Sequence, residues 1–514
     1  MMSKYVLGLD VGTTTLRSFL YNNKGEVCYS CVEKVDLVNP KPGWVEIDPD
    51  ILWNKVVKVL ETCVSNVPRE DVSGLGISCQ RGTFTCWSKS TGRPFHNLIT
   101  WKDLRADSLV KMWNKSFSIR ALRLGGKILH WITRMPRYQA ASIFTLFNGL
   151  VILRLVWALD NIPGLREAAQ KDDLMFGCVD SWLLYNLTGK HMTEISNIAA
   201  TGMFDPFTME YASWIYSLFN IPESMMPRIV SSCGDHFGST SADLLGISIP
   251  IRAVLADQSA SVFGSGCTQL GAAKITMGTG SFIDVVTASA HASMNGLIPI
   301  IGWKIKEEVV HLAEGSVHDT GVILDWGRSV QLFDDFNDIS EIVNSVADCG
   351  GVYFVPGFNG MQKPVLDPSA TAGFIGLNIN TTKPQLLRSI LECIAFTQKQ
   401  LVDSFLTESN YKIDKLVVDG GVAQNDFILQ YIADLTGLPV ERPENVEMSA
   451  WGTAALAGIQ VGLWKNREEL NSLRSQGTFF TRNPGNTRCL SDYKAWQKAC
   501  LRFTKWKQEE EENA

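Results

Sequence analysis

Two turns of the chain combine glycines with hydroxyl side chains where apolar, strand-like runs end. At the first, Asp10 and Gly12 follow the run from Tyr5 to Leu9 and precede Thr13, Thr14 and Thr15. Glycine lets a phosphate approach the backbone and threonine adds hydroxyl donors, so the turn suits phosphate, with Arg17 as a nearby cation. Asp10 suits Mg²⁺ held through water better, because Mg²⁺ uses few carboxylates and keeps several waters.

The same design returns in "AAKITMGTGSFIDVVTAS" (272–289), where Gly278, Thr279 and Gly280 separate two apolar runs. Either turn by itself is better explained as an ordinary hairpin turn. The two matching turns, together with the glycine-rich "DGGVAQN" (419–425), favour a phosphate site between two similar halves. We expect the hinge between these halves near residues 267–271.

The elements around these turns alternate between short apolar runs and segments of helical periodicity, the pattern of an α/β protein. Strands are expected at 72–80 and at the start of 414–426. Helices are expected at 386–405 and 450–464, and from Ile51 towards Val64 with Asp50 as the cap.

Length and composition indicate an ordinary folded protein of more than one domain. The chain has 514 residues, of which 45% are hydrophobic and 19% are charged, with a net charge of −6. The mildly acidic balance argues against nucleic acid as a partner. The apolar stretch 140–159 contains Asn148, Gly149 and Arg154, so we expect a buried helix, or a helix then a strand, rather than a membrane span.

The cysteine pattern favours reduced thiols. Twelve cysteines are scattered along the chain. Cys28 and Cys31 form a lone CxxC in a strand-like stretch, without the second pair that a zinc ribbon needs. We therefore expect a cytoplasmic protein, and the apolar run beginning at Tyr5 leaves little room for a signal peptide.

Several segments resemble the FGGY carbohydrate kinase family, and its glycerol kinase branch most, in the ATPase superfamily of actin, hexokinase and Hsp70. In the family's order they are "PKPGWVEIDPDILW" (40–53), "GISCQRGTFTCW" (76–87), "ADQSASVFG" (256–264), "TMGTGSF" (276–282), "DGGVAQNDF" (419–427) and "ERPENVEMSAWGTAALAG" (441–458). The similarity covers nearly the whole chain except about residues 110 to 155.

The resemblance implies an α/β fold of two ribonuclease-H-like domains around a nucleotide cleft. The polyol and phosphate side would be residues 4–267 and the nucleotide side 271–465. Residues 466–514 would form a C-terminal helix and an acidic tail.

The resemblance also implies a function: an ATP- and Mg²⁺-dependent kinase that phosphorylates a small polyol. The leading candidate reaction is the conversion of glycerol to glycerol 3-phosphate. Two alternatives remain. The protein could be a kinase for another sugar or polyol, or a nucleotide-binding protein with little or no kinase activity that acts through partners. The family's catalytic base falls on Asp257, with Asp10 as the second catalytic carboxylate. Its nucleotide-binding positions fall on Thr13, Thr14, Thr15, Arg17, Thr279, Gly321, Gly421 and Asn425. Its acceptor-binding positions fall on Arg81, Trp101, Asp257, Gln258 and Phe282.

The chain departs from the family at the acceptor pocket. The family places a Glu after the arginine at position 81, where this chain has Gly82. The segment that carries an aromatic polyol contact looks deleted after Ile152. We therefore expect glycerol to be a poor acceptor, and Gly82→Glu to improve its use.

The region 108–159 contains no Asp or Glu but carries Lys111, Lys115, Arg120, Arg123, Lys127, Arg134, Arg137 and Arg154. The aromatic residues Trp113, Phe117, Trp131 and Phe144 are interleaved with these cations. Weak contact of residues 111–142 with an anionic membrane surface would fit this pattern. The favoured alternative is a surface insertion whose charges pair with acidic residues elsewhere. Assembly into a homo-oligomer stays open.

Overall fold

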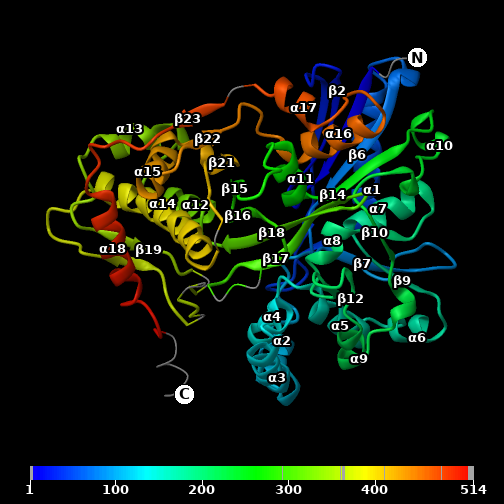
Figure 1. Cartoon of the computed structure of the whole chain (residues 1–514), viewed down its shortest axis with the longest axis horizontal. Coiled ribbons are helices and arrows are strands. Elements are labelled where there is room, and N and C mark those ends of the chain that lie inside the picture. The colour runs from blue at the N-terminus through cyan, green and yellow to red at the C-terminus, as the bar shows by residue number, and fades with distance from the viewer. Residues whose placement is uncertain are drawn as a thin grey trace.

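The computed structural model describes residues 4–506 except 292, 294, 359, 362–364, 368, 410 and 476. The expected acidic tail, 507–514, lies outside these residues. Figure 1 shows two lobes side by side, the blue-to-green first half of the chain in one and most of the yellow-to-red second half in the other. The two-domain α/β prediction is therefore confirmed.

The first lobe is built on a five-stranded sheet. Its order is β14 (Ile251–Ala256), β6 (Val72–Cys79), β1 (Tyr5–Val11), β2 (Thr15–Asn22) and β3 (Val27–Lys34). Strands β1, β2 and β3 are antiparallel, whereas β6 and β14 run parallel to β1. The expected opening hairpin is thus confirmed as β1 and β2.

The second lobe repeats this plan in a seven-stranded sheet. Its order is β17 (Ile298–Ile305), β18 (Glu308–Val317), β16 (Ser281–Thr287), β15 (Ala273–Met277), β21 (Leu416–Asp419), β22 (Val440–Arg442) and β23 (Thr478–Phe480). Strands β15, β16 and β18 are antiparallel and β21 runs parallel to β15, as β6 does to β1. The sequence repeat predicted at 272–289 therefore reflects a repeat of strand order and direction between the two sheets.

Helices cover both faces of the first sheet because the residues of β1 alternate in direction. Leu7 and Leu9 pack in the core beneath α1 (Pro49–Val64), whereas Val6 packs towards α16 (Met448–Gln460). The cap of α1 was predicted wrongly: the Asp48 carboxylate, rather than Asp50, accepts the first backbone N–H groups. Pro49 occupies the first helical position, which moves the start of the helix upstream.

Two helices join the lobes. Helix α16 packs on β1, β6 and β14 and against α11 (Asp257–Gly264), and Figure 1 shows the orange α16 beside blue strands. The approach is close, since a Cβ at Gly76 would lie 2.2 Å from the Thr453 carbonyl oxygen. On α11, the Ser261 hydroxyl donates to Asp419 at the end of β21, 3.1 Å away. The end of β14 and the end of β21 are therefore held in one packed unit.

The second lobe's core forms around α14 (Lys383–Glu408), the long helix expected at 386–405. The other helices of this lobe are α12 (Gly321–Ser329), α13 (Ile339–Asn344), α15 (Asp426–Thr436) and α18 (Cys489–Cys500). Helix α17 (Arg467–Leu473) lies instead beside α16 on the first lobe (Figure 1), where Leu470 packs in one cluster with Trp451. Its remaining strands are the pair β19 (Tyr353–Val355) and β20 (Gly373–Ile375).

The first lobe also carries a smaller sheet and a group of helices. The sheet contains β4 (Leu37–Val38), β5 (Glu46–Ile47), β8 (Leu98–Ile99), β7 (Phe84–Ser88) and β9 (Leu174–Cys178). The helices are α2 (Asp107–Lys115), α3 (Phe117–Thr133), α4 (Pro136–Ile143), α5 (Val151–Asn161), α6 (Leu165–Gln170), α7 (Val179–Thr188), α8 (Ile195–Ala199), α9 (Ser213–Phe219) and α10 (Ala242–Leu245). Short strands β10 (Met192–Glu194), β11 (Phe204–Asp205), β12 (Glu210–Tyr211) and β13 (Arg228–Val230) complete the lobe.

The apolar stretch 140–159 is divided between two helices. It includes the end of α4 and most of the buried α5, with a non-helical connection between them. Among the described residues, the helices are all too short or too polar to cross a bilayer. The expectation of a buried helix is thus confirmed for α5.

Candidate functional site

Three polar side chains meet where the parallel strands β1, β6 and β14 end. Asp10 lies opposite Ser78 on β6, and Cys79 lies opposite Ala256 on β14. Asp257 follows β14 directly and begins α11. The two predicted catalytic carboxylates therefore lie at the same edge of the sheet, and the charge of Asp257 adds to burial in raising the pKa of Asp10.

Asp10 is buried and held in place by polar neighbours. The Ser78 hydroxyl donates to its Oδ1 at 2.8 Å, and the Arg17 Nη1 lies 3.8 Å from its Oδ2. Burial raises the pKa of Asp10 to about 7. An uncompensated carboxylate of this kind gains from a nearby cation, so Asp10 fits the predicted role of holding Mg²⁺.

Arg17 makes a contact that the sequence did not suggest. Its Nη1 lies 2.5 Å from Oε2 of Glu447, the residue that precedes α16. The predicted phosphate cation is therefore partly neutralised by a carboxylate from the far end of the chain. No local pattern marked Glu447, because the pair is separated by 430 residues.

The first glycine-threonine turn is tied to the predicted acceptor position. The Thr13 hydroxyl donates to Gln80 Oε1 at 2.9 Å and accepts from Trp101 Nε1 at 2.8 Å. The turn is closed by a hydrogen bond from the Gly12 N–H to the Thr15 carbonyl oxygen, and the Thr14 carbonyl accepts from the Val35 N–H. The structure thus brings Thr13 and Trp101 together, with Gln80 as an unpredicted link.

Asp257 lies in a network with Arg81 and Gln258. The Gln258 N–H donates to Asp257 Oδ1 at 2.7 Å, and Arg81 Nε lies 3.8 Å from the same oxygen. Burial raises the pKa of Asp257, and the charge of Arg81 opposes this shift. Gln258 Oε1 is buried and, within the described part of the chain, has no hydrogen-bond partner. It is therefore available to a hydroxyl of a bound acceptor.

Arg81 also contacts a buried carboxylate of the second lobe, Glu314. Its Nη2 lies 2.6 Å from Glu314 Oε2 on β18. Glu314 lies opposite Asp284 of β16, and burial together with the Glu314 charge raises the pKa of Asp284 well above its ordinary value. Phe282 shares its face of β16 with Asp284, since side chains two apart point the same way. Sequence analysis missed both acids; the only signal was a charge within the apolar run "FIDVV".

The predicted nucleotide-side positions cluster around the second turn. The Gly321 N–H, at the start of α12, donates to the Gly278 carbonyl at 3.0 Å, and the Val322 N–H donates to the Thr279 carbonyl. Gly420, next to Gly421, lies so close that a Cβ there would be 2.4 Å from the Met277 carbonyl oxygen. Thr279, Gly321 and Gly421 therefore belong to one backbone cluster at the ends of β15 and β21.

Asn425 has a structural role in this cluster. Its side chain caps α15 by accepting from the Ile428 N–H at 3.2 Å, and its Nδ2 donates to Ser340 at 3.3 Å. Asp419, which opens the "DGGVAQN" motif, is paired with the fully buried Lys274 at 2.7 Å. The glycine-rich motif thus begins with a buried ion pair that fixes the end of β21.

Gly82 has a backbone conformation that the sequence did not reveal. Its φ is +68°, a region that residues with a side chain seldom adopt. A Cβ there would lie 3.2 Å from the Gly149 carbonyl oxygen and 3.6 Å from Arg154 Nη2. Arg154 is fully buried on α5 and donates to the Gly149 carbonyl at 3.0 Å. Among the described residues Arg154 forms no ion pair, so its guanidinium is free to attract a carboxylate at position 82.

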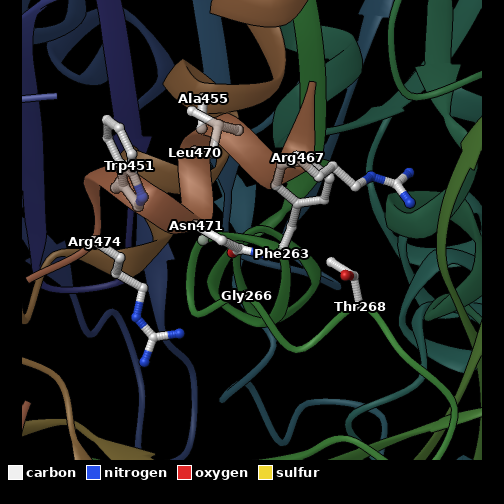
Figure 2. Close-up of a pocket in the computed structure, with 10 residues that line it drawn as sticks. Phe263, Gly266, Thr268, Trp451, Ala455, Arg467, Leu470, Asn471 and Arg474 are labelled. Carbon is white, nitrogen blue, oxygen red and sulfur yellow. The ribbon is translucent and has the colours of Figure 1, made fainter. Parts of the chain in front are cut away.

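A small pocket lies away from this network, beside the expected hinge. Figure 2 shows Phe263, Thr268, Trp451 and Arg474 around it, and Gly266 also lines it. Arg474 is already bonded to the Ser265 carbonyl and to Glu441. None of the residues predicted for catalysis or binding lines this pocket, so it contributes nothing to the candidate site.

Family comparisons agree with this geometry. Residues 5–264 match the N-terminal domain of the FGGY family of carbohydrate kinases, and residues 273–461 match its C-terminal domain. Glycerol kinase 5 of Danio rerio is 44% identical over 513 residues, which cover 98% of this chain and 97% of that protein. Glycerol kinase 2 of Thermotoga maritima is 35% identical over 510 residues, covering 98% and 99%.

Solved structures show the same architecture. The crystal structure of Plasmodium falciparum glycerol kinase with ADP superposes with a TM-score of 0.88 at 25% identity, covering 97% of this chain and 98% of that one. Gluconate kinase from Lactobacillus acidophilus gives a TM-score of 0.80 at 20% identity, covering 97% of each chain, and so shares the fold.

Proposed function

The chain belongs to the FGGY family of carbohydrate kinases and is an ATP-dependent carbohydrate or polyol kinase; on this premise we propose that its acceptor is a small polyol, with glycerol converted to glycerol 3-phosphate as the first candidate. The observation that carries the proposal is the network of Asp257 with Arg81 and Gln258 at the edge that Asp10 shares. A base, a cation and a free amide oxygen are the groups that would orient a hydroxyl for attack on phosphate.

Asp257 would accept the proton of the attacking hydroxyl and hold that hydroxyl in position. Arg81 keeps the Asp257 carboxylate oriented and lowers its proton affinity, which burial would otherwise raise further. The backbone cluster of Gly278, Thr279 and Gly321 and the first turn would bind the nucleotide from either lobe. Mg²⁺, which neutralises phosphate charge when bound, would be held by Asp10 through water.

A screen of polyols and sugars tests this proposal. ADP release would be measured with each acceptor against a blank without acceptor, at saturating ATP and Mg²⁺. Stimulation by glycerol and other small polyols supports the proposal. Stimulation by a sugar alone would assign a different acceptor, and ATP binding without stimulation by any acceptor would favour the nucleotide-binding alternative.

The structure changes the expected outcome of Gly82→Glu. A new carboxylate could still accept hydrogen bonds from a polyol, a contribution of about 1.5–3 kcal/mol. The left-handed conformation at position 82 costs any side chain roughly 1–2 kcal/mol, and Arg154 competes for the carboxylate. We therefore expect kcat/KM for glycerol to rise by no more than about tenfold over the wild type.

Gly82→Ala is the matched control, because it carries the same backbone strain without the carboxylate. The Glu variant should exceed the Ala variant by about ten- to hundredfold in kcat/KM for glycerol. Equal values in the two variants would mean that a carboxylate at position 82 does not reach the acceptor.

A further inference from the structure

The helices α2, α3 and α4 project from the first lobe as a separate unit (Figure 1). Hydrogen bonds between its own residues hold the unit together. Arg123 Nε donates to the Phe144 carbonyl at 2.8 Å, and Asn114 exchanges hydrogen bonds with the backbone of Leu146. Ser116 caps α3 by accepting from the Ile119 N–H. The unit is thus a built structure rather than a loose loop.

The aromatic residues of this unit divide into two groups. Trp113 packs against Phe219 with 4.6 Å between ring centroids, and Phe144 packs against Trp214 at 5.7 Å. These two anchor the unit to α9. Phe117 and Trp131 instead point to solvent, with 85% and 72% of their surfaces exposed.

Helix α3 therefore exposes apolar side chains on the side that a surface helix normally covers with polar ones. Its packed side carries the buried Ile119 and Gly126, and Gly126 lies against α4. On the opposite side, spaced as one face of a helix, lie the exposed residues Phe117, Leu124, Ile128, Trp131 and Ile132, which we call the α3 outer face. An exposed apolar stripe of this length marks an interaction surface.

The cations around this face are without acidic partners. Lys111 pairs with Asp107 and Arg137 pairs with Asp205, but the described residues provide no carboxylate within ion-pair distance of Lys115, Arg120, Lys127 or Arg134. The expectation that the insertion's charges pair with acids elsewhere is thus wrong for these four. Arg120 and Lys127 flank the α3 outer face on one side, three residues or one turn from its apolar members.

We propose that the α3 outer face binds an anionic lipid surface. Exposed Phe, Trp and aliphatic residues bordered by unpaired cations match a helix that lies in the membrane interface, apolar side down and cations towards the headgroups. The seventeen residues of α3 extend for about 25 Å, and the helix lies on the surface because it cannot cross it. The unpaired cations beside this face favour lipids with negatively charged headgroups, although the protein as a whole is acidic.

Flotation of the full-length protein with vesicles tests the proposal. We expect binding to phosphatidylcholine vesicles containing phosphatidylserine at low salt, weakening as salt rises, and little binding to phosphatidylcholine alone. Phe117→Ser with Trp131→Ser should abolish binding. Arg120→Gln with Lys127→Gln should weaken it by about fivefold for each cation removed.

Matched controls are Ile379→Ser, which removes another exposed apolar side chain, and Lys24→Gln with Lys412→Gln, which removes two exposed cations elsewhere. They should bind as the wild type does, and all variants should keep wild-type ADP release, which shows that they fold. Equal binding to neutral vesicles, or wild-type binding by the α3 variants, would overturn the proposal. So would a wild-type dimer that becomes a monomer in Phe117→Ser/Trp131→Ser without any vesicle binding, because a second copy would then occupy the face.

Discussion

Replacing Asp257 with asparagine is expected to lower acceptor-dependent turnover by about 10²–10⁴-fold while ATP affinity stays close to that of the wild type. Asparagine keeps the size of the side chain and can still contact the Gln258 N–H, which now holds Asp257 Oδ1 at 2.7 Å. It cannot take the proton of the attacking hydroxyl. The measurement is kcat for the best acceptor of the screen, alongside nucleotide affinity by calorimetry.

Asp414→Asn is the control for the Asp-to-Asn change alone, since Asp414 is exposed and, within the described part of the chain, forms an ion pair with the exposed Lys412 alone. That variant should turn over normally. An Asp257→Asn enzyme with unchanged kcat would remove Asp257 from the mechanism, whereas a parallel loss of ATP affinity would assign it to nucleotide binding instead.

Replacing Arg81 with methionine is expected to reduce both stability and activity. Glu314 is buried, Arg81 is half-buried, and the two lie 2.6 Å apart, so removing the cation leaves Glu314 without its partner and takes one of two nearby cations from Asp284. Breaking a buried pair from one side costs about 3–5 kcal/mol of unfolding free energy. Loss of the contact to Asp257 should also lower acceptor kcat/KM about 10²-fold, because the base is no longer oriented.

Urea unfolding of a matched set of variants separates these effects. Arg166→Met, which breaks an exposed pair with Asp160, should cost no more than about 1 kcal/mol. The double variant Arg81→Met/Glu314→Gln should recover much of the lost stability, because the orphaned charge is gone, but not the lost activity. A single Arg81→Met variant as stable as the wild type would show that Glu314 gains nothing from the pair.

Local pattern was sufficient for the α/β class of this chain and for its two matching hairpins. The paired strands around Thr13–Thr15 and around Gly278–Gly280, and the long core helix α14, lie where apolar runs and helical periodicity predicted them. These features depend on neighbours within a few residues, so the sequence contains them directly. The chemistry of the first turn assigned a metal-holding role to Asp10, and the family resemblance assigned the role of base to Asp257. Strand order explains why the two carboxylates lie at one edge.

Contacts between distant segments could not be read in this way. The pairing of Arg17 with Glu447 depends on how α16 packs against the first sheet, and that of Arg81 with Glu314 depends on where β18 lies beside Arg81; no local signal encodes either placement. The cap of α1 shifted from Asp50 to Asp48 because two neighbouring acids offer equal local chemistry and backbone geometry chooses between them.

For the same reason, the composition of a segment does not show which of its charges are exposed and unpaired. A count of cations in residues 108–159 could not tell which of them find acidic partners, and only the packed helices leave Arg120 and Lys127 without one beside an exposed Phe117 and Trp131. The positive φ of Gly82 and the buried Arg154 behind it are likewise products of the fold. Residue types therefore determined which chemistry this protein carries, and the tertiary structure decided which of those groups face one another, because burial and pairing are properties of three-dimensional neighbours.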